Sequence, residues 1–195
     1  MKKTIGWMGL LLLAAWHCQA QEPAPNQRWI EQADGGFVFP VSPGASQNYG
    51  RGLGGDILVG YRIDRRFSLG LDLGYYDFDQ KTLGAAGGEW VYTSLLGVAR
   101  YTVGTGWVRP FLFGGIGLAF NNVSMGGGAG TKANRSETGP LLSPGAGVLF
   151  ILGDGLALFA QGRLDMDFVS PMGGLAPENP TLFFPLKAGI SIFPE

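Results

Sequence analysis

The polar side chains of residues 155–169, GLALFAQGRLDMDFV, have the types and the spacing that could do chemistry. Gln161, Arg163, Asp165 and Asp167 occupy every second position, and alternate side chains of a β-strand lie on one face. Two carboxylates two positions apart resemble a DxD metal motif, but no His or third acid is close in the sequence. We therefore expect ion pairing here rather than a metal site, and we expect no cofactor.

The residues between these polar positions are mostly apolar. Leu156, Leu158, Leu164 and Phe168 oppose the polar set, which predicts a strand with one apolar and one polar face. The same alternation recurs to the end of the chain. It predicts eight strands, at about 35–41, 54–63, 67–79, 89–103, 108–121, 141–152, 156–169 and 181–193.

The connections between the expected strands alternate in length. Short turns fall at 64–66, 104–106 and 153–155. Long connections fall at 42–53, 80–88, 122–140 and 170–180. An antiparallel barrel with short turns at one end and long loops at the other produces this order. We therefore predict an all-β fold, an eight-stranded antiparallel up-and-down transmembrane β-barrel, with both termini and the short turns facing the periplasm.

The apolar face of each strand is expected to meet lipid, and the polar face to line the interior. Charged residues make up 15% of the chain and glycines number 34, whereas soluble domains average about 25% charged residues and about 7% Gly. Glycine at polar-face positions suits the narrow interior of eight strands better than a surface in water. The alternative is a soluble lipocalin-like binder with its Leu face inward.

The polar faces together predict one charge network in the lumen. Its expected members are Asp56, Arg62, Asp72, Arg100, Arg109, Gln161, Arg163, Asp165, Asp167 and Lys187. Charges in a closed interior must be paired to offset their desolvation. We expect a structural plug of ion pairs, with a gate or narrow pore whose pairs can switch as the alternative.

Aromatic residues gather toward the two ends of the expected strands, as the interfacial girdles of a membrane barrel do. The girdle expected at the short-turn end contains Tyr61, Phe67, Tyr101 and Trp107. The girdle expected at the long-loop end contains Tyr75, Trp90, Tyr92, Phe168 and Phe184.

The N-terminus predicts export. Residues 1–20 have a Lys-Lys start and an apolar run and are expected to be a secretory signal peptide, followed by a periplasmic lead over 21–32 and the barrel over 33–195. The only His and the only Cys, His17 and Cys18, would leave with the signal. Without a His as general base we expect no enzyme. The formal net charge of −1 gives no reason to expect a nucleic-acid partner.

Two stretches carry a family resemblance. VRPFLFGGIGLAF (108–120) and PGAGVLFILGDGLALFAQGRLDMDF (144–168) resemble the outer-membrane protein β-barrel domain, the group of OmpA-, OmpX- and OmpW-like eight-stranded barrels. The resemblance covers essentially all of 33–193. Such barrels usually end on an aromatic residue, whereas here Phe193 is followed by Pro194 and Glu195.

The resemblance implies a place in the bacterial outer membrane, with membrane lipid, lipopolysaccharide and the barrel-assembly machinery as partners. The expected role is structural or in surface interaction, with the loops at 80–88, 122–140 and 170–180 as contact elements for extracellular partners. OmpW-like relatives suggest the alternative of a narrow channel for small or apolar solutes. A constriction lined by Leu58, Phe111, Phe113 and Phe159 would favour that alternative.

Overall fold

The structure, a computed structural model, describes residues 28–80, 89–126, 132–153, 155–168 and 180–193. Its elements are β1 (Trp29–Pro40), α2 (Pro43–Asn48), β2 (Tyr49–Arg62), β3 (Phe67–Gln80), β4 (Glu89–Thr102), β5 (Val108–Gly126), β6 (Lys132–Gly153), β7 (Leu156–Arg163), β8 (Asp165–Asp167) and β9 (Thr181–Ile192). Within these described residues, none of the helical structure has the length and apolar character that crossing a membrane would need.

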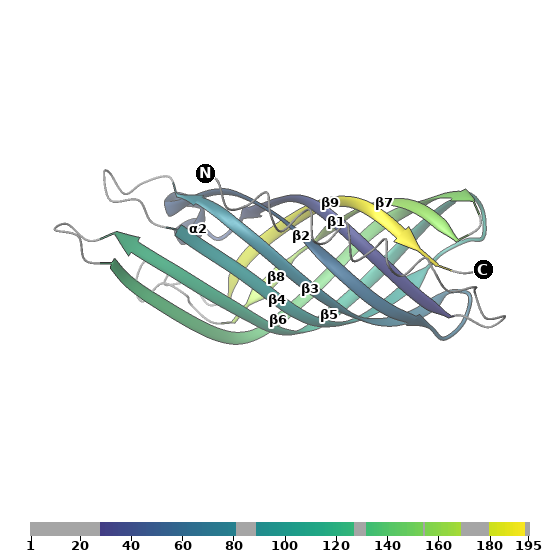
Figure 1. The fold of residues 1–195 in the computed structure, drawn as a ribbon, viewed down its shortest axis with the longest axis horizontal. Coiled ribbons are helices and arrows are strands. Elements are labelled where there is room, and N and C mark those ends of the chain that lie inside the picture. Colours follow the sequence, from purple (N-terminus) through teal and green to yellow (C-terminus); the bar gives the residue numbers. More distant parts are fainter. Residues whose placement is uncertain (1–27, 81–88, 127–131, 154, 169–179, 194–195) are drawn as a thin grey trace, which may run out of the picture.

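The strands form one closed antiparallel sheet (Figure 1). Each strand from β1 to β6 pairs with the next, and β7 and β8 both pair with β9. The ring closes between β1 and β9, with a register that runs from Glu31↔Ile192 to Pro40↔Phe183. The predicted all-β antiparallel barrel is therefore confirmed.

β7 and β8 lie end to end and together occupy the position of one expected strand, 156–169. The backbone N–H of Leu164 donates to the carbonyl of Pro144 at 2.9 Å, but proline has no N–H to donate in return. The paired register continues on both sides of this point, from Gly145↔Arg163 to Leu142↔Met166. Pro144 thus interrupts the ladder at Leu164 without shifting it, and the ring has eight strand positions.

The ends of several strands differ from the expected ones. β1 begins at Trp29, so that residues 29–32 of the expected periplasmic lead belong to the barrel wall. The expected loop 42–53 contains α2 and the first residues of β2. The expected loop 122–140 is mostly a hairpin, because β5 and β6 stay paired as far as Gly126↔Lys132. The segments 1–20, 81–88 and 170–179, with the signal peptide and most of two expected loops, lie outside the described residues.

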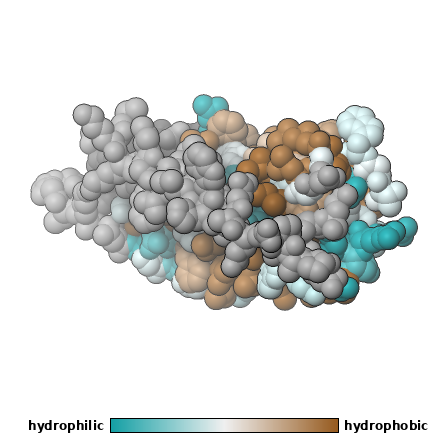
Figure 2. Space-filling view, turned by 45° about the vertical axis from the view of Figure 1, so that its right-hand side comes forward, coloured by the Kyte–Doolittle hydropathy of each residue, from teal (hydrophilic) through white to brown (hydrophobic). Residues whose placement is uncertain are grey.

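The two faces of each strand differ as the alternation predicts. On β3, Leu69, Leu71 and Leu73 are 47–64% exposed on the outside, whereas Asp72 between them is 4% exposed. Apolar side chains, brown in Figure 2, cover much of the described outer surface that this view shows. Such a surface is stable against lipid hydrocarbon, and the closed ring leaves no strand edge unpaired there.

Candidate functional site

Arg163 lies at the centre of the lumen. Its side chain is 1% exposed, and its Nη1 atom is 2.9 Å from Asp56 Oδ2 and 3.3 Å from Asp72 Oδ1. Its Nε atom is 2.9 Å from Asp165 Oδ1. Asp56 and Asp72 belong to β2 and β3, which do not neighbour β7 in the sheet. The guanidinium therefore joins opposite walls of the barrel.

Lys187 supplies a second buried cation beside the first. Its Nζ atom is 3.4 Å from Asp34 Oδ2 and also forms an ion pair with Asp56. The Asp34 carboxylate accepts further hydrogen bonds from Gln161 Nε2, at 3.2 Å, and from the backbone N–H of Asp56, at 2.9 Å. Asp56 is thus shared between the two cations.

Hydroxyl groups complete this central layer. Tyr76 donates to Asp56 Oδ1 at 2.6 Å, and Ser143 donates to Asp165 Oδ1 at 2.5 Å. Ser94 accepts from Arg163 Nη2 at 3.5 Å. These bonds offset part of the desolvation cost of the buried charges, while Asp165 Oδ2 has no hydrogen-bond partner among the described residues.

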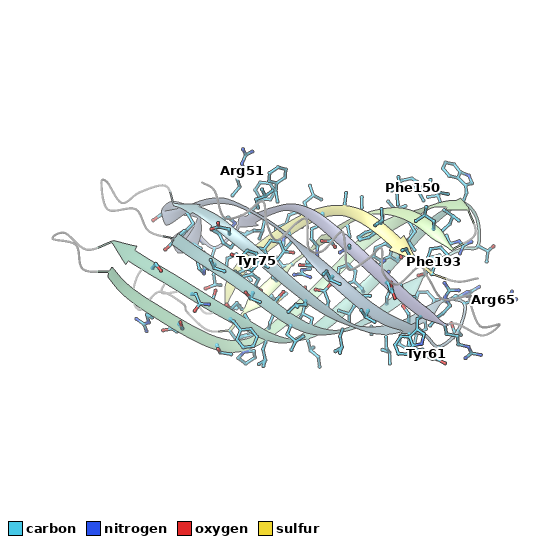
Figure 3. The ribbon with its side chains drawn as sticks, in the orientation of Figure 1. Arg51, Tyr61, Arg65, Tyr75, Phe150 and Phe193 are labelled. Carbon is cyan, nitrogen blue, oxygen red and sulfur yellow. The ribbon has the colours of Figure 1, made fainter. Side chains whose placement is uncertain are left out.

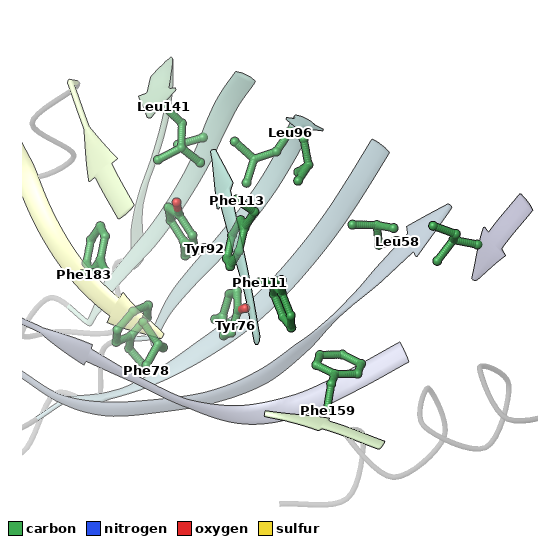
Figure 4. Close-up of a cluster of buried hydrophobic side chains, with 14 of the residues drawn as sticks. Leu58, Tyr76, Phe78, Tyr92, Leu96, Phe111, Phe113, Leu141, Phe159 and Phe183 are labelled. Atoms are coloured by element: carbon green, nitrogen blue, oxygen red, sulfur yellow. The ribbon is translucent and has the colours of Figure 1, made fainter. Parts of the chain in front are cut away.

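An aromatic layer lies on the long-loop side of the ion pairs, and Figure 4 labels two of its members, Phe78 and Phe183. The indole of Trp90 stacks on Phe78, with ring centroids 4.4 Å apart, and contacts Phe183 at 5.3 Å. Its Nε1 donates to Asn121 at 3.1 Å, and Asn121 in turn donates to Asp167 Oδ2 at 2.7 Å. Asp167 therefore belongs to this layer as well as to the charged strand β8.

A second apolar layer lies on the short-turn side, formed by Leu58, Phe111, Phe113 and Phe159, each at most 9% exposed (Figure 4). The Arg100 guanidinium lies 4.5 Å from the centroid of the Phe111 ring and donates to Gln32. A cavity of about 10 Å³ beside Arg100 has room for one water molecule at most.

The structure brings together most of the predicted charge network. The central layer contains Asp56, Asp72, Gln161, Arg163, Asp165 and Lys187. Asp167 is buried on the long-loop side of this layer, and Arg100 is buried on its short-turn side. Arg62 and Arg109 lie apart at the short-turn rim. Arg62 is 5.2 Å from the Phe193 ring, and Arg109 Nε donates to the carbonyl of Gly106 at 2.9 Å.

The sequence analysis missed several members of the site: Gln32, Asp34, Tyr76, Ser94, Asn121 and Ser143. Gln32 and Asp34 fell before the expected start of the first strand. The alternation of the strand could have revealed them, because Gln32, Asp34 and Val38 lie at even-numbered positions and share the inward face of β1. Tyr76, Ser94, Asn121 and Ser143 carry no charge, and the expected network consisted of charged residues apart from Gln161.

Seven of the nine expected girdle residues lie on the outer surface. Tyr61, Tyr75, Tyr101, Trp107, Phe168 and Phe184 are exposed there, and Phe67 is half-buried. Trp90 and Tyr92 were wrongly placed, since both are 0% exposed inside the lumen. On β4 the even-numbered residues face inward, and both share that face with Ser94 and Arg100.

A closed antiparallel barrel with an apolar outer surface and a charged interior defines a transmembrane β-barrel protein. The model of the outer membrane protein beta-barrel domain matches residues 8–168. The chain belongs to this family, and its place is the bacterial outer membrane. Comparison with curated protein sequences gave no match.

Solved structures of outer-membrane proteins share the fold. Neisserial surface protein A is 21% identical, with a TM-score of 0.62 over 86% of this chain and 97% of that one. Ail, the attachment invasion locus protein of Yersinia pestis, solved with the heparin analogue sucrose octasulfate, is 13% identical, with a TM-score of 0.55 over 85% and 100%. OprG from Pseudomonas aeruginosa is 14% identical, with a TM-score of 0.54 over 84% and 94%.

Proposed function

We propose that this barrel has a non-enzymatic role, structural or in surface interaction, and that its ion pairs close the lumen. The observation that carries this proposal is Arg163, whose guanidinium lies within 3.3 Å of three carboxylates on different strands. A side chain that ties opposite walls together at mid-height blocks the path that a solute would need.

The layers on either side support closure. The layer that contains Trp90 and Phe78 packs on the long-loop side of the ion pairs. The layer that contains Leu58 and Phe111 packs on their short-turn side. The side chains of Leu58, Phe111, Phe113 and Phe159 form part of this filling, together with the paired charges rather than in place of them. Removing one partner of a buried ion pair costs about 3–5 kcal/mol, because the other charge is left buried without compensation.

The surface-interaction part of the proposal rests on the β5–β6 hairpin. Among the described residues, β6 pairs with β8 only at Leu141 and Leu142, while its pairing with β5 continues to Lys132. The hairpin therefore extends beyond the rest of the wall (Figure 1). Arg135 and Glu137 form an ion pair on it. We propose that it faces outward, toward lipopolysaccharide or another cell surface, with the short turns in the periplasm.

Single-channel conductance of the refolded barrel in a planar bilayer tests closure. A gel shift between unboiled and boiled samples first confirms folding. A silent barrel is expected, and Arg163→Ala, if it folds, should conduct. Arg51→Ala, which changes an arginine 5.2 Å from the Phe37 ring, is the matched control and should stay silent. Steady conductance of the unmodified barrel would refute the plug and support a narrow channel.

A further inference from the structure

The short-turn end of the barrel carries an arc of arginines. Arg28 precedes β1, Arg65 and Arg66 lie in the β2–β3 turn, and Arg62 and Arg109 lie at the adjoining strand ends. Arg28, Arg62, Arg65 and Arg66 lie at the ends of β1, β2 and β3, which are neighbours in the sheet, and Arg109 lies two strands further on, on β5. The described residues of the β6–β7 turn, Gly153 and Gly155, add no positive charge. The arc is therefore one-sided.

The carboxylate of Asp64, which lies within this arc, accepts hydrogen bonds from the backbone. Asp64 Oδ1 accepts the N–H of Arg66 at 2.7 Å and that of Phe67 at 2.8 Å, and these bonds lower the pKa of Asp64. This carboxylate fixes the turn and presents Arg65 and Arg66 outward. Among the residues that the structure describes, Glu31 is the other acid close to this end, and it lies in the wall on β1.

Aromatic side chains show the depth at which these arginines lie. Arg66 Nη1 is 3.4 Å from the hydroxyl of Tyr101, which is 45% exposed on the outer face. Trp29 and Tyr61 form an edge-to-face pair nearby on the same face, with centroids 5.6 Å apart. Such aromatic belts lie at the level of the lipid headgroups. Figure 3 shows Arg65 and Tyr61 at this same end.

We propose that Arg28, Arg65 and Arg66 bind the phosphate of an anionic phospholipid in the leaflet at the short-turn end. A guanidinium donates two parallel hydrogen bonds to a phosphate, and is the side chain best suited to hold one. Tyr61, Tyr101 and Trp29 would pack against the upper part of the acyl chains. The proposal concerns the outer wall and does not depend on whether the lumen conducts.

The test is the association of spin-labelled phosphatidylglycerol and phosphatidylcholine with the barrel reconstituted in phosphatidylcholine vesicles, followed by electron spin resonance. The unmodified barrel should prefer phosphatidylglycerol. Arg65→Gln/Arg66→Gln should lower that preference by up to about fivefold for each arginine, and 1 M salt should do the same. Arg51→Gln/Arg135→Gln removes the same charge at the other end and should keep the preference, because Arg135 is already paired with Glu137. A gel shift verifies the folding of each variant.

Equal association of the two lipids with the unmodified barrel would overturn the proposal, and so would an unchanged preference in Arg65→Gln/Arg66→Gln. Inorganic phosphate at constant ionic strength distinguishes the source of the anion. If a few millimolar phosphate abolished the preference, the arc would be a site for free phosphate rather than for a headgroup. Binding of purified peptidoglycan to vesicle-embedded barrel with no lipid preference would likewise refute the lipid site.

Discussion

Asp56 and Arg163 lie 107 positions apart in the chain, yet their Oδ2 and Nη1 atoms are 2.9 Å apart at the centre of the barrel. β2 is among the first strands of the chain and β7 comes near its end. The contact therefore exists only once the ring has closed. The ion pair in the lumen thus depends on the same closed sheet that forms the wall.

Arg163→Ala should destabilise the folded barrel. The substitution leaves the Asp56, Asp72 and Asp165 carboxylates buried without their shared cation. We expect a loss of about 3–5 kcal/mol in the free energy of unfolding, measured by urea titration in lipid vesicles. Arg51→Ala, at an exposed position, should change it by less than about 0.5 kcal/mol. Equal stability of the two variants would show that the network contributes nothing.

Leu158→Arg tests which face meets lipid. Leu158 is 46% exposed on the outside, and the cost of an arginine on the lipid face reaches about 2–4 kcal/mol at the bilayer midplane and falls toward the interfaces. Gln161→Arg places the same charge inside, where Asp34 lies 3.2 Å from the Gln161 amide, and should be milder. Folding yields into vesicles compare the two. If Leu158→Arg folded normally and Gln161→Arg did not, the faces would be reversed.

Much of this arrangement follows from the sequence. Alternation separated Leu69 and Leu71 from Asp72, and unequal loops indicated a barrel. The errors have physical causes. Polar residues such as Asn122 and Ser124 were interpreted as loop, although backbone pairing continues through them. Trp90 was assigned to lipid because aromatic residues favour the interface, but an indole N–H also suits a lumen that offers it a carbonyl oxygen, here that of Asn121.

Tryptophan fluorescence tests the corrected position of Trp90. Single-tryptophan variants in vesicles of brominated lipid should show strong quenching for Trp107, which is 73% exposed, and for Trp29, which is 55% exposed. Trp90, 0% exposed and stacked on Phe78 inside the barrel, should keep its emission. Quenching of Trp90 as strong as that of Trp107 would show that Trp90 lies on the lipid face.

Two neighbouring glycines should respond differently to an added methyl group. A Cβ at Gly117 would collide with the backbone carbonyl of Leu95, whereas one at Gly97 would lie 3.7 Å from the Ile116 carbonyl, an ordinary contact. Gly117→Ala should therefore cost about 1–3 kcal/mol in the free energy of unfolding. Gly97→Ala is the control and should be neutral or slightly stabilising. Equal costs would contradict the close approach of β4 and β5 at Gly117.

The prolines of β6 make one part of the wall easier to open than the rest. Pro144 accepts from Leu164 and Pro140 accepts from Phe168, at 2.9 and 3.1 Å, but neither can donate back. The seam between β6 and β8 therefore has fewer hydrogen bonds than its length allows, and an apolar groove of about 480 Å³ lies on the lipid side of it, lined in part by Pro140 and Phe168. Asp165 and Asp167 of β8 lie on the lumen side of the same seam. The amide protons of this seam should be among the first in the wall to exchange with deuterium, and the barrel should unzip from there when it is pulled apart.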